Sequence, residues 1–123
     1  MRDNEQDAEP RLQVTAKGDV TVVEIGNRKI LDEINITQLG EQLSKLAAQS
    51  PDPKLVIDFA NVAHMSSSAL GMLITLHKRI CQRKGQLRLC NIRPGIYEVF
   101  VITRLNEIFH IHQSREEALA SLG

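Results

Sequence analysis

LVIDFANVAHMSSSALGMLI, residues 55–74, is the stretch that decides the fold. Residues 54–59 are largely apolar, which is typical of a strand that is buried on both faces. A short loop follows and ends in Ser66, Ser67 and Ser68, after which apolar residues recur at helical spacing. The pattern therefore predicts serine hydroxyls at the start of a helix, near the end of a buried strand. Such a position suits a hydroxyl that is phosphorylated or binds a partner, and does not suit one hidden in a core.

Outward from this stretch, the apolar pattern predicts alternating strands and helices. Two strands over 12–16 and 20–25 form an N-terminal hairpin, and a brief extended piece covers 28–31. The 96–104 helix is expected to bury Val99, Phe100 and either Ile102 or Thr103. Helices between apolar strands indicate crossover connections, and hence an α/β fold with a mixed β-sheet and about four helices packed on it. The four helices are predicted over 35–49, from 67 or 68 to 84, over 96–104 and over 115–122, the last of them after the capping box Ser114/Glu117. The further strands are predicted over 54–59, 87–92 and 108–111.

Length and composition limit the class of protein. The 123 residues fit one domain, with a disordered tail over 1–10 and the domain over 11–123. Lys and Arg number 15, as do Asp and Glu, and this balance argues against a nucleic-acid binder. No apolar run approaches the roughly 20 residues that cross a bilayer, and the acidic N-terminus lacks a secretory signal. We therefore expect a cytoplasmic protein that binds neither nucleic acid nor membrane.

The serine cluster has two interpretations. Serine is a favoured N-cap, so a structural role accounts for one of the three hydroxyls and leaves the other two able to face solvent. A phosphate adds roughly −1.5 to −2 charge, which a helix N-terminus tolerates but a partner packed against it does not. Asp32, in the loop before the first helix, is either a cap or, if that loop lies beside the serines, part of the same partner-facing surface.

Other chemistries find little support in the sequence. A hydrolase elbow needs Gly-x-Ser-x-Gly, and no glycine stands two residues before any of the three serines, although His64 precedes them. His110 and His112 share a strand face, but further ligands at metal-binding spacing are missing, so exposed strand-end histidines are expected. Cys81 and Cys90 lack CxxC spacing and are expected to be ordinary reduced residues. No phosphate-binding glycine motif is present, and no cofactor is expected.

The stretch from Leu55 to Phe59, then Val62 and Ser66-Ser67-Ser68-Ala69-Leu70-Gly71, resembles the signature of the STAS domain, and more narrowly that of the anti-sigma factor antagonists (anti-anti-sigma factors). In that family a buried strand leads into a loop of the form Asp-Ser-Ser/Thr-Gly-Leu-Gly, which opens the second helix. The hairpin, Leu31-Asp32 and the closing helix agree, so the resemblance spans about residues 11–122. It implies a STAS-type fold.

The resemblance also implies a mechanism. The unphosphorylated protein binds an anti-sigma factor, typically a serine kinase with a GHKL-type ATP site, and so releases a sigma factor for transcription. The kinase then phosphorylates one serine of the loop, the complex dissociates, and a PP2C-type phosphatase resets the switch. Such a bacterial signalling protein is not itself an enzyme, and we expect a monomer when it is free.

Alignment on Leu70-Gly71 places the phosphorylated serine at Ser67. Ser66 stands where the family has aspartate, which leaves Ser66 open as an alternative acceptor, and Ala69 stands where it has glycine. Asp32 matches the family's loop acid. A competing interpretation is a phosphorylation-independent STAS adaptor subunit of a stress-signalling scaffold or lipid-transport complex. In either case the implied partner-binding surface consists of Asp32, Met65, Ser66, Ser67, Ser68, Ala69 and Met72, of which Met72 is equally compatible with a core position.

Overall fold

The structure, a computed structural model, describes residues 9–122. The predicted tail over 1–10 therefore lies outside the described residues, except for Glu9 and Pro10. The main-chain carbonyl of Glu9 accepts a hydrogen bond from Asn27 Nδ2 at 2.8 Å, so the chain is already tied to the domain at this residue.

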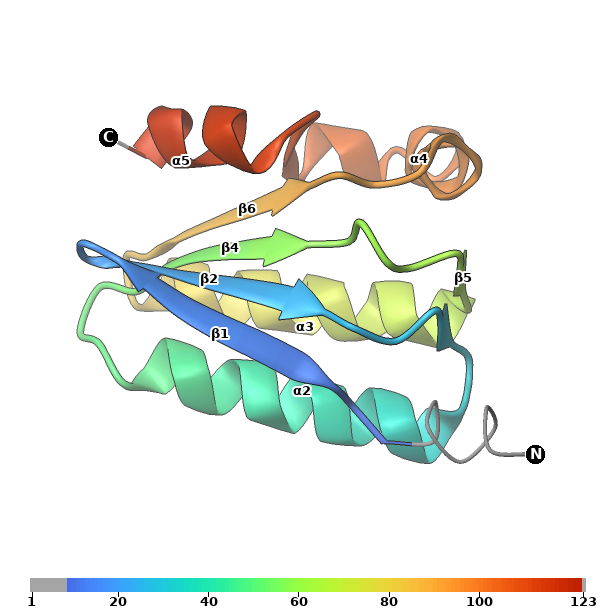
Figure 1. Ribbon diagram of the computed structural model, residues 1–123, viewed down its shortest axis with the longest axis horizontal. Coiled ribbons are helices and arrows are strands. Elements are labelled where there is room, and N and C mark those ends of the chain that lie inside the picture. Colours follow the sequence, from blue (N-terminus) through green and yellow to red (C-terminus); the bar gives the residue numbers. More distant parts are fainter. Residues whose placement is uncertain (1–8, 123) are drawn as a thin grey trace.

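A five-stranded sheet with the strand order β1-β2-β4-β6-β7 forms the centre of the molecule (Figure 1). The predicted hairpin consists of β1 (Leu12–Lys17) and β2 (Val20–Ile25), which pair antiparallel. Three strands continue the sheet in parallel: β4 (Lys54–Asp58), β6 (Gln86–Cys90) and β7 (His110–His112). The prediction of a mixed sheet is confirmed.

Four α-helices pack on this sheet within residues 9–122, the number that the sequence predicts. Two of them, α2 (Glu33–Ala48) and α3 (Ser67–Gln82), lie side by side on one face. The last helix, α5 (Arg115–Leu122), covers β4, β6 and β7 from the opposite face (Figure 1). Beyond the carboxyl end of β6 lies α4 (Pro94–Ile102), followed by the 3₁₀ turn η1 (Leu105–Glu107).

Alternation along the strands divides the core into two clusters. In β4, Leu55 and Ile57 face α2 and α3 and belong to the larger cluster, whereas Val56 faces α5 and belongs to the smaller one. The smaller cluster comprises Val20, Val22, Val56, Cys90, Ala118 and Leu122. By the same alternation Asp58, two residues after Val56, points to the α5 face at the carboxyl end of the central strand.

The predicted buried face of α4 is confirmed for Phe100 and wrong for Val99 and for Ile102 or Thr103. Ile96 and Phe100 point into the core, whereas Val99 is 41% and Ile102 77% exposed, and Thr103 is exposed as well. The helix is apolar on nearly every side, so periodicity did not single out the inner face. The contact that fixes it is the edge-to-face packing of Phe100 on Phe109, with ring centroids 5.8 Å apart.

Some predicted boundaries shift for identifiable reasons. The helix predicted from about Asn35 begins at Glu33, because Asp32 accepts hydrogen bonds from the Ile34 and Asn35 amides at 2.8 and 3.4 Å. The last strand begins at His110 rather than at residue 108, because the turn η1 occupies the residues before it. A second small sheet pairs β3 (Lys29–Ile30) with β5 (His64–Met65); β5 was not predicted.

Replacing Gly85 by alanine is expected to lower the free energy of unfolding by about 2 kcal/mol, because overpacking a fixed site is costly. A methyl group there would collide with the main-chain oxygen of Pro53, which already accepts from Gln86 N at 2.8 Å and cannot move freely. Urea unfolding measures the change. The control is Gly71→Ala, where a methyl group meets nothing within 4 Å; equal stabilities of the two variants would contradict the packing argument.

Candidate partner-binding site

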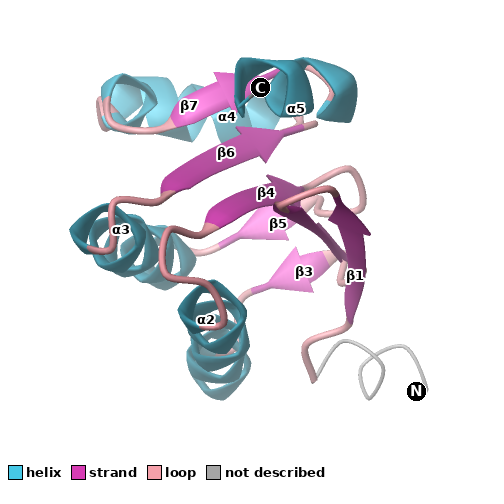
Figure 2. Cartoon of the chain, turned by 90° about the vertical axis from the view of Figure 1, so that its left-hand side faces the viewer, coloured by secondary structure: helices cyan, strands magenta, loops and turns pink. Residues whose placement is uncertain are grey.

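The N-termini of α2 and α3 are brought together by the small sheet. Its register pairs Lys29 with His64 and Ile30 with Met65 in parallel, and Ser66 N donates to Ile30 O at 3.0 Å. The residues that enter α2 therefore run alongside those that enter α3, and the two helices start at the same end of the molecule (Figure 1). Figure 2 shows the two strands of this small sheet, which is separate from the main one, next to each other. Each helix start contributes unpaired amides and partial positive charge.

The three serines have different surroundings at the start of α3. Ser66 is the N-cap, and its Oγ accepts a hydrogen bond from Ala69 N at 3.4 Å. Ser68 is exposed and donates from its hydroxyl to Glu33 Oε2 at 3.3 Å, which links the first turns of α3 and α2. Ser67, the first residue of the helix, is exposed, and its hydroxyl has no hydrogen-bond partner within residues 9–122. Of the three serines, Ser67 is thus the one whose hydroxyl is both exposed and free of a hydrogen bond within the described residues.

Most of the other residues predicted for the surface lie around these serines. Asp32 is exposed at the start of α2, and Met65 is half-buried immediately before the Ser66 cap. Met72 is half-buried one turn into α3 and packs against the core beside Gly40 of α2. Ala69 differs from the prediction, because its side chain is completely buried. It supports the helix start from beneath and presents no side-chain surface to a partner.

A shallow groove with apolar walls lies beside the serines. Its lining includes the apolar side chains of Leu31, Met65, Ile96 and Val99, the last two from α4, and the polar residues His64 and Arg93. Leu31 and Val99 are exposed, so the groove offers apolar contact area next to the helix starts. Sequence reasoning missed the contribution of α4, because it placed Val99 in the core.

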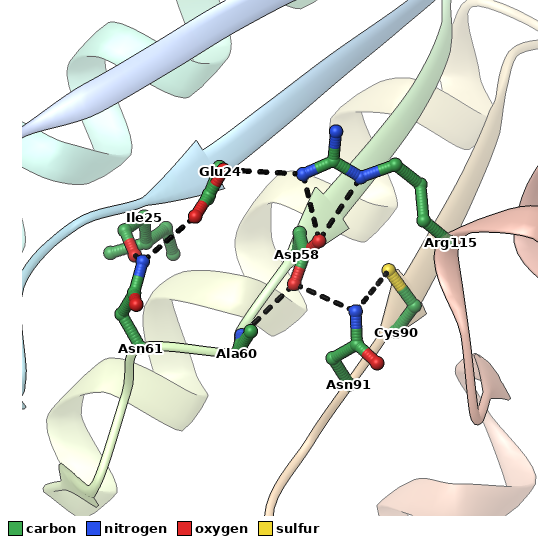
Figure 3. Close-up of polar contacts among 8 residues, drawn as sticks. All are labelled: Glu24, Ile25, Asp58, Ala60, Asn61, Cys90, Asn91 and Arg115. Atoms are coloured by element: carbon green, nitrogen blue, oxygen red, sulfur yellow. Dashed lines mark hydrogen bonds and ion pairs between the residues drawn. The ribbon is translucent and has the colours of Figure 1, made fainter.

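A partly buried polar network at the opposite face of the sheet was also missed by sequence reasoning. Asp58, with its side chain 5% exposed, accepts from Arg115 Nη2 at 2.8 Å and Nε at 3.1 Å, and from Asn91 Nδ2 at 3.0 Å (Figure 3). Arg115 Nη2 also donates to Glu24 Oε1 at 3.3 Å. Hydrogen bonding to Asp58, followed by the attraction of Asp58 and Glu24, raises the pKa of Arg115.

The two cysteines differ in exposure, and this gives a prediction about thiol reactivity. Burial, followed by the nearby charge of Asp58, raises the pKa of Cys90 to about 12, whereas Cys81 is exposed on α3. Because the thiolate is the reactive form, iodoacetamide at pH 8 should modify Cys81 in the folded protein and Cys90 only after unfolding. Peptide mapping after a timed pulse measures both rates; comparable rates in the native state would contradict the burial of Cys90.

Neither serine hydrolysis nor metal binding is supported by the arrangement of side chains in the described part of the chain. His64 is exposed on β5, and no imidazole hydrogen-bonds to any of the three serines within residues 9–122. His110 is exposed and His112 half-buried, and residues 9–122 contain no group of three or more His, Cys, Asp or Glu side chains arranged to hold a metal ion. Nor does any helix of this region have the length and apolar character to cross a membrane.

Comparison with known proteins identifies the class. The model of the STAS domain matches residues 11–118, so the chain belongs to the STAS domain family, as the sequence predicts. A Bordetella bronchiseptica protein described as an anti-sigma factor antagonist, BtrV, is 36% identical over 84 residues, which cover 66% of this chain and 72% of that protein.

Solved structures confirm the STAS-type fold. An anti-sigma-factor antagonist (STAS) domain protein from Planctomyces limnophilus has a TM-score of 0.78 at 24% identity, covering 89% of this chain and 96% of that one. The Bacillus cell fate determinant SpoIIAA in its phosphorylated form has a TM-score of 0.69 at 18% identity, covering 92% and 100%. At these identities the likeness concerns the fold alone.

Proposed function

We propose that this chain is a phosphorylation-switched antagonist of an anti-sigma factor. In its unphosphorylated form it binds an anti-sigma factor that is also a serine kinase of the GHKL type, and a sigma factor is released for transcription. Transfer of a phosphate to Ser67 dissociates the complex, and a PP2C-type phosphatase restores the binding form. The observation that carries the proposal is the exposed hydroxyl of Ser67 at the helix start, which has no hydrogen-bond partner within residues 9–122.

The surroundings of the serines support Ser67 over Ser66 as the acceptor. The aspartate that the family has at position 66 can cap a helix, and Ser66 performs the same capping without the charge. Its hydroxyl is thereby engaged, and that of Ser68 is held by Glu33. The negative charge that the missing aspartate would bring is partly supplied from α2, because the carboxylate of Glu33 reaches across to the first turn of α3.

The same surroundings support the effect of phosphorylation. Asp32 and Glu33 already place two carboxylates at the start of α2, beside the start of α3. A phosphate on Ser67 would add roughly −1.5 to −2 charge, which the amides of α3 can accommodate. A partner that packs closely on this surface would have to desolvate the phosphate next to the carboxylates of Asp32 and Glu33, and this cost would dissociate the complex.

Alanine at each serine in turn tests the assignment. Ser66→Ala should lower the free energy of unfolding by about 1 kcal/mol through loss of the cap, and should still be phosphorylated. Ser67→Ala should keep the wild-type stability within error and carry no phosphate. Ser68→Ala is the matched control and should be phosphorylated like the wild type. Urea unfolding and intact mass, measured on protein from the cells that produce it, give both results; phosphate retained in Ser67→Ala and lost in Ser66→Ala would move the acceptor to Ser66.

Isolation of the partner tests the wider proposal. Tagged Ser67→Ala should co-purify from the native cells with a protein that has a kinase domain and that also binds a sigma factor. A partner with neither property, held equally by the wild type and Ser67→Asp, would instead favour the phosphorylation-independent adaptor.

A further inference from the structure

The carboxyl ends of β2 and β4 carry one acid each on the face covered by α5. Glu24 and Asp58 are register neighbours in the parallel pairing of these strands, and Arg115, the first residue of α5, lies between them (Figure 3). Its guanidinium bonds Asp58 Oδ2 at 2.8 and 3.1 Å and Glu24 Oε1 at 3.3 Å. Without this cation the two carboxylates would face each other as like charges across adjacent strands.

Each of these acids uses its second oxygen to hold the loop that leads to the serines. Asp58 Oδ1 accepts from Ala60 N at 2.9 Å, and Glu24 Oε2 accepts from Asn61 Nδ2 at 2.9 Å. Asn61 Nδ2 also lies 3.3 Å from Ile25 O. Both carboxylates therefore bridge α5 on one side and the start of the loop on the other, as Figure 3 shows.

The far end of this loop is fixed by different contacts. The amides of Ala63 and His64 donate to Arg28 O at 2.7 and 3.1 Å, and Ser66 N donates to Ile30 O. Few residues separate these two anchored ends. A shift of the first end is therefore transmitted over a short, ordered segment to the start of α3, where Ser67 is displayed.

We propose that Arg115 is a positioning residue for Ser67: by holding Asp58 and Glu24 it fixes the start of the loop over residues 60–66, so that the presentation of Ser67 depends on the hydrogen bonds that Arg115 makes to these two acids. The inference rests on the proposed function for its consequence, which is phosphorylation at Ser67, while the positioning itself is a property of the free protein. It gives the last helix of the chain, which lies on the opposite face of the sheet from α3, a role in the switch.

Hydrogen–deuterium exchange of the free protein tests the positioning. Arg115→Gln removes the cation, and Arg115→Lys keeps the charge but lacks the fork that reaches both acids. In Arg115→Gln the amides of Ala63, His64 and Ser66 should exchange about tenfold faster than in the wild type, and in Arg115→Lys the increase should be smaller. Glu24→Gln, which leaves Asp58 paired, keeps the test available if Arg115→Gln does not fold, and should also loosen the loop.

Leu122→Ala is the matched control. Leu122, the last residue of α5, is buried in the smaller cluster and takes no part in the network. Its truncation should speed exchange within α5 and leave the loop as in the wild type. Equal acceleration of the loop in the Leu122 and Arg115 variants, or no acceleration in the Arg115 variants, would overturn the proposal, because Arg115 would then serve only the general stability of α5.

Phosphate occupancy at Ser67 in the native cells gives the second readout. Arg115→Lys should reduce it several-fold relative to Leu122→Ala, once both are compared at equal protein abundance. Occupancy as high as in the control would overturn the link from Arg115 to Ser67. Absence of phosphate from the wild type itself would reject the proposed function instead, and the exchange experiment would still decide whether Arg115 positions the loop.

Discussion

Replacing Ser67 by aspartate is expected to weaken binding of the anti-sigma partner roughly 100-fold, a loss of about 2.7 kcal/mol. The change puts a carboxylate at the first residue of α3, beside the start of α2 with Asp32 and Glu33. The helix start accepts the charge within the free protein, so the fold should be kept while the interface is lost. Titration calorimetry with the partner isolated from the native cells measures the affinity.

Two further variants isolate the effect of position from that of charge. Ser67→Ala should bind the partner at least as tightly as the wild type and should stay bound in the presence of ATP. Thr75→Asp adds the same charge to an exposed position two turns further along α3 and should bind nearly as well as the wild type. Wild-type affinity of Ser67→Asp would show that Ser67 does not lie at the interface.

Replacing Asp58 by alanine is expected to lower the free energy of unfolding by about 3 kcal/mol. The carboxylate is buried and accepts four hydrogen bonds, from Ala60 N, Asn91 Nδ2 and the two nitrogens of Arg115. Its removal takes this acceptor from Ala60 N, leaves Asn91 Nδ2 with the weak contact to Cys90 Sγ at 4.0 Å, and leaves the guanidinium with Glu24. Urea unfolding of the variant against the wild type gives the difference.

Asp58→Asn and Asp19→Ala serve as controls for this loss. Asparagine keeps the shape and one acceptor oxygen but cannot neutralise Arg115, so its stability should fall between those of wild type and Asp58→Ala. Asp19 makes an ion pair with Lys54 at 3.0 Å while 75% exposed, and its removal should change stability little. Equal effects of the Asp19 and Asp58 substitutions would contradict the structural role of the network.

The main elements were predictable because their local patterns are unambiguous. The buried strand at 54–58, the hairpin and the amphipathic helices α2 and α3 each follow from a period of apolar residues. The α4 helix has apolar residues on almost every side, so its inner face was decided by Phe109, a contact that periodicity does not contain. The strand β5 has only two residues and exists through its pairing with β3, which leaves no pattern in the sequence.

The location of the candidate site was predictable from the sequence, but the hydrogen-bonding role of each serine within it was not. Three serines before an apolar helix indicate a helix start, but that Ser68 is engaged and Ser67 is not depends on Glu33, which is far from them along the chain. The network of Glu24, Asp58 and Arg115 joins residues that lie up to 91 positions apart. No local motif marks any of these three charged residues in the sequence, and only the fold brings them together.

The central claim is that a phosphate on Ser67 decides whether the partner is bound. The most direct measurement separates the protein of the native cells into a partner-bound and a free pool and maps phosphate on peptides that cover residues 64–71. The account predicts unmodified serines in the bound pool and phosphate on Ser67 in the free pool. Phosphate on none of the three serines under any growth condition, or on Ser67 equally in both pools, would contradict it.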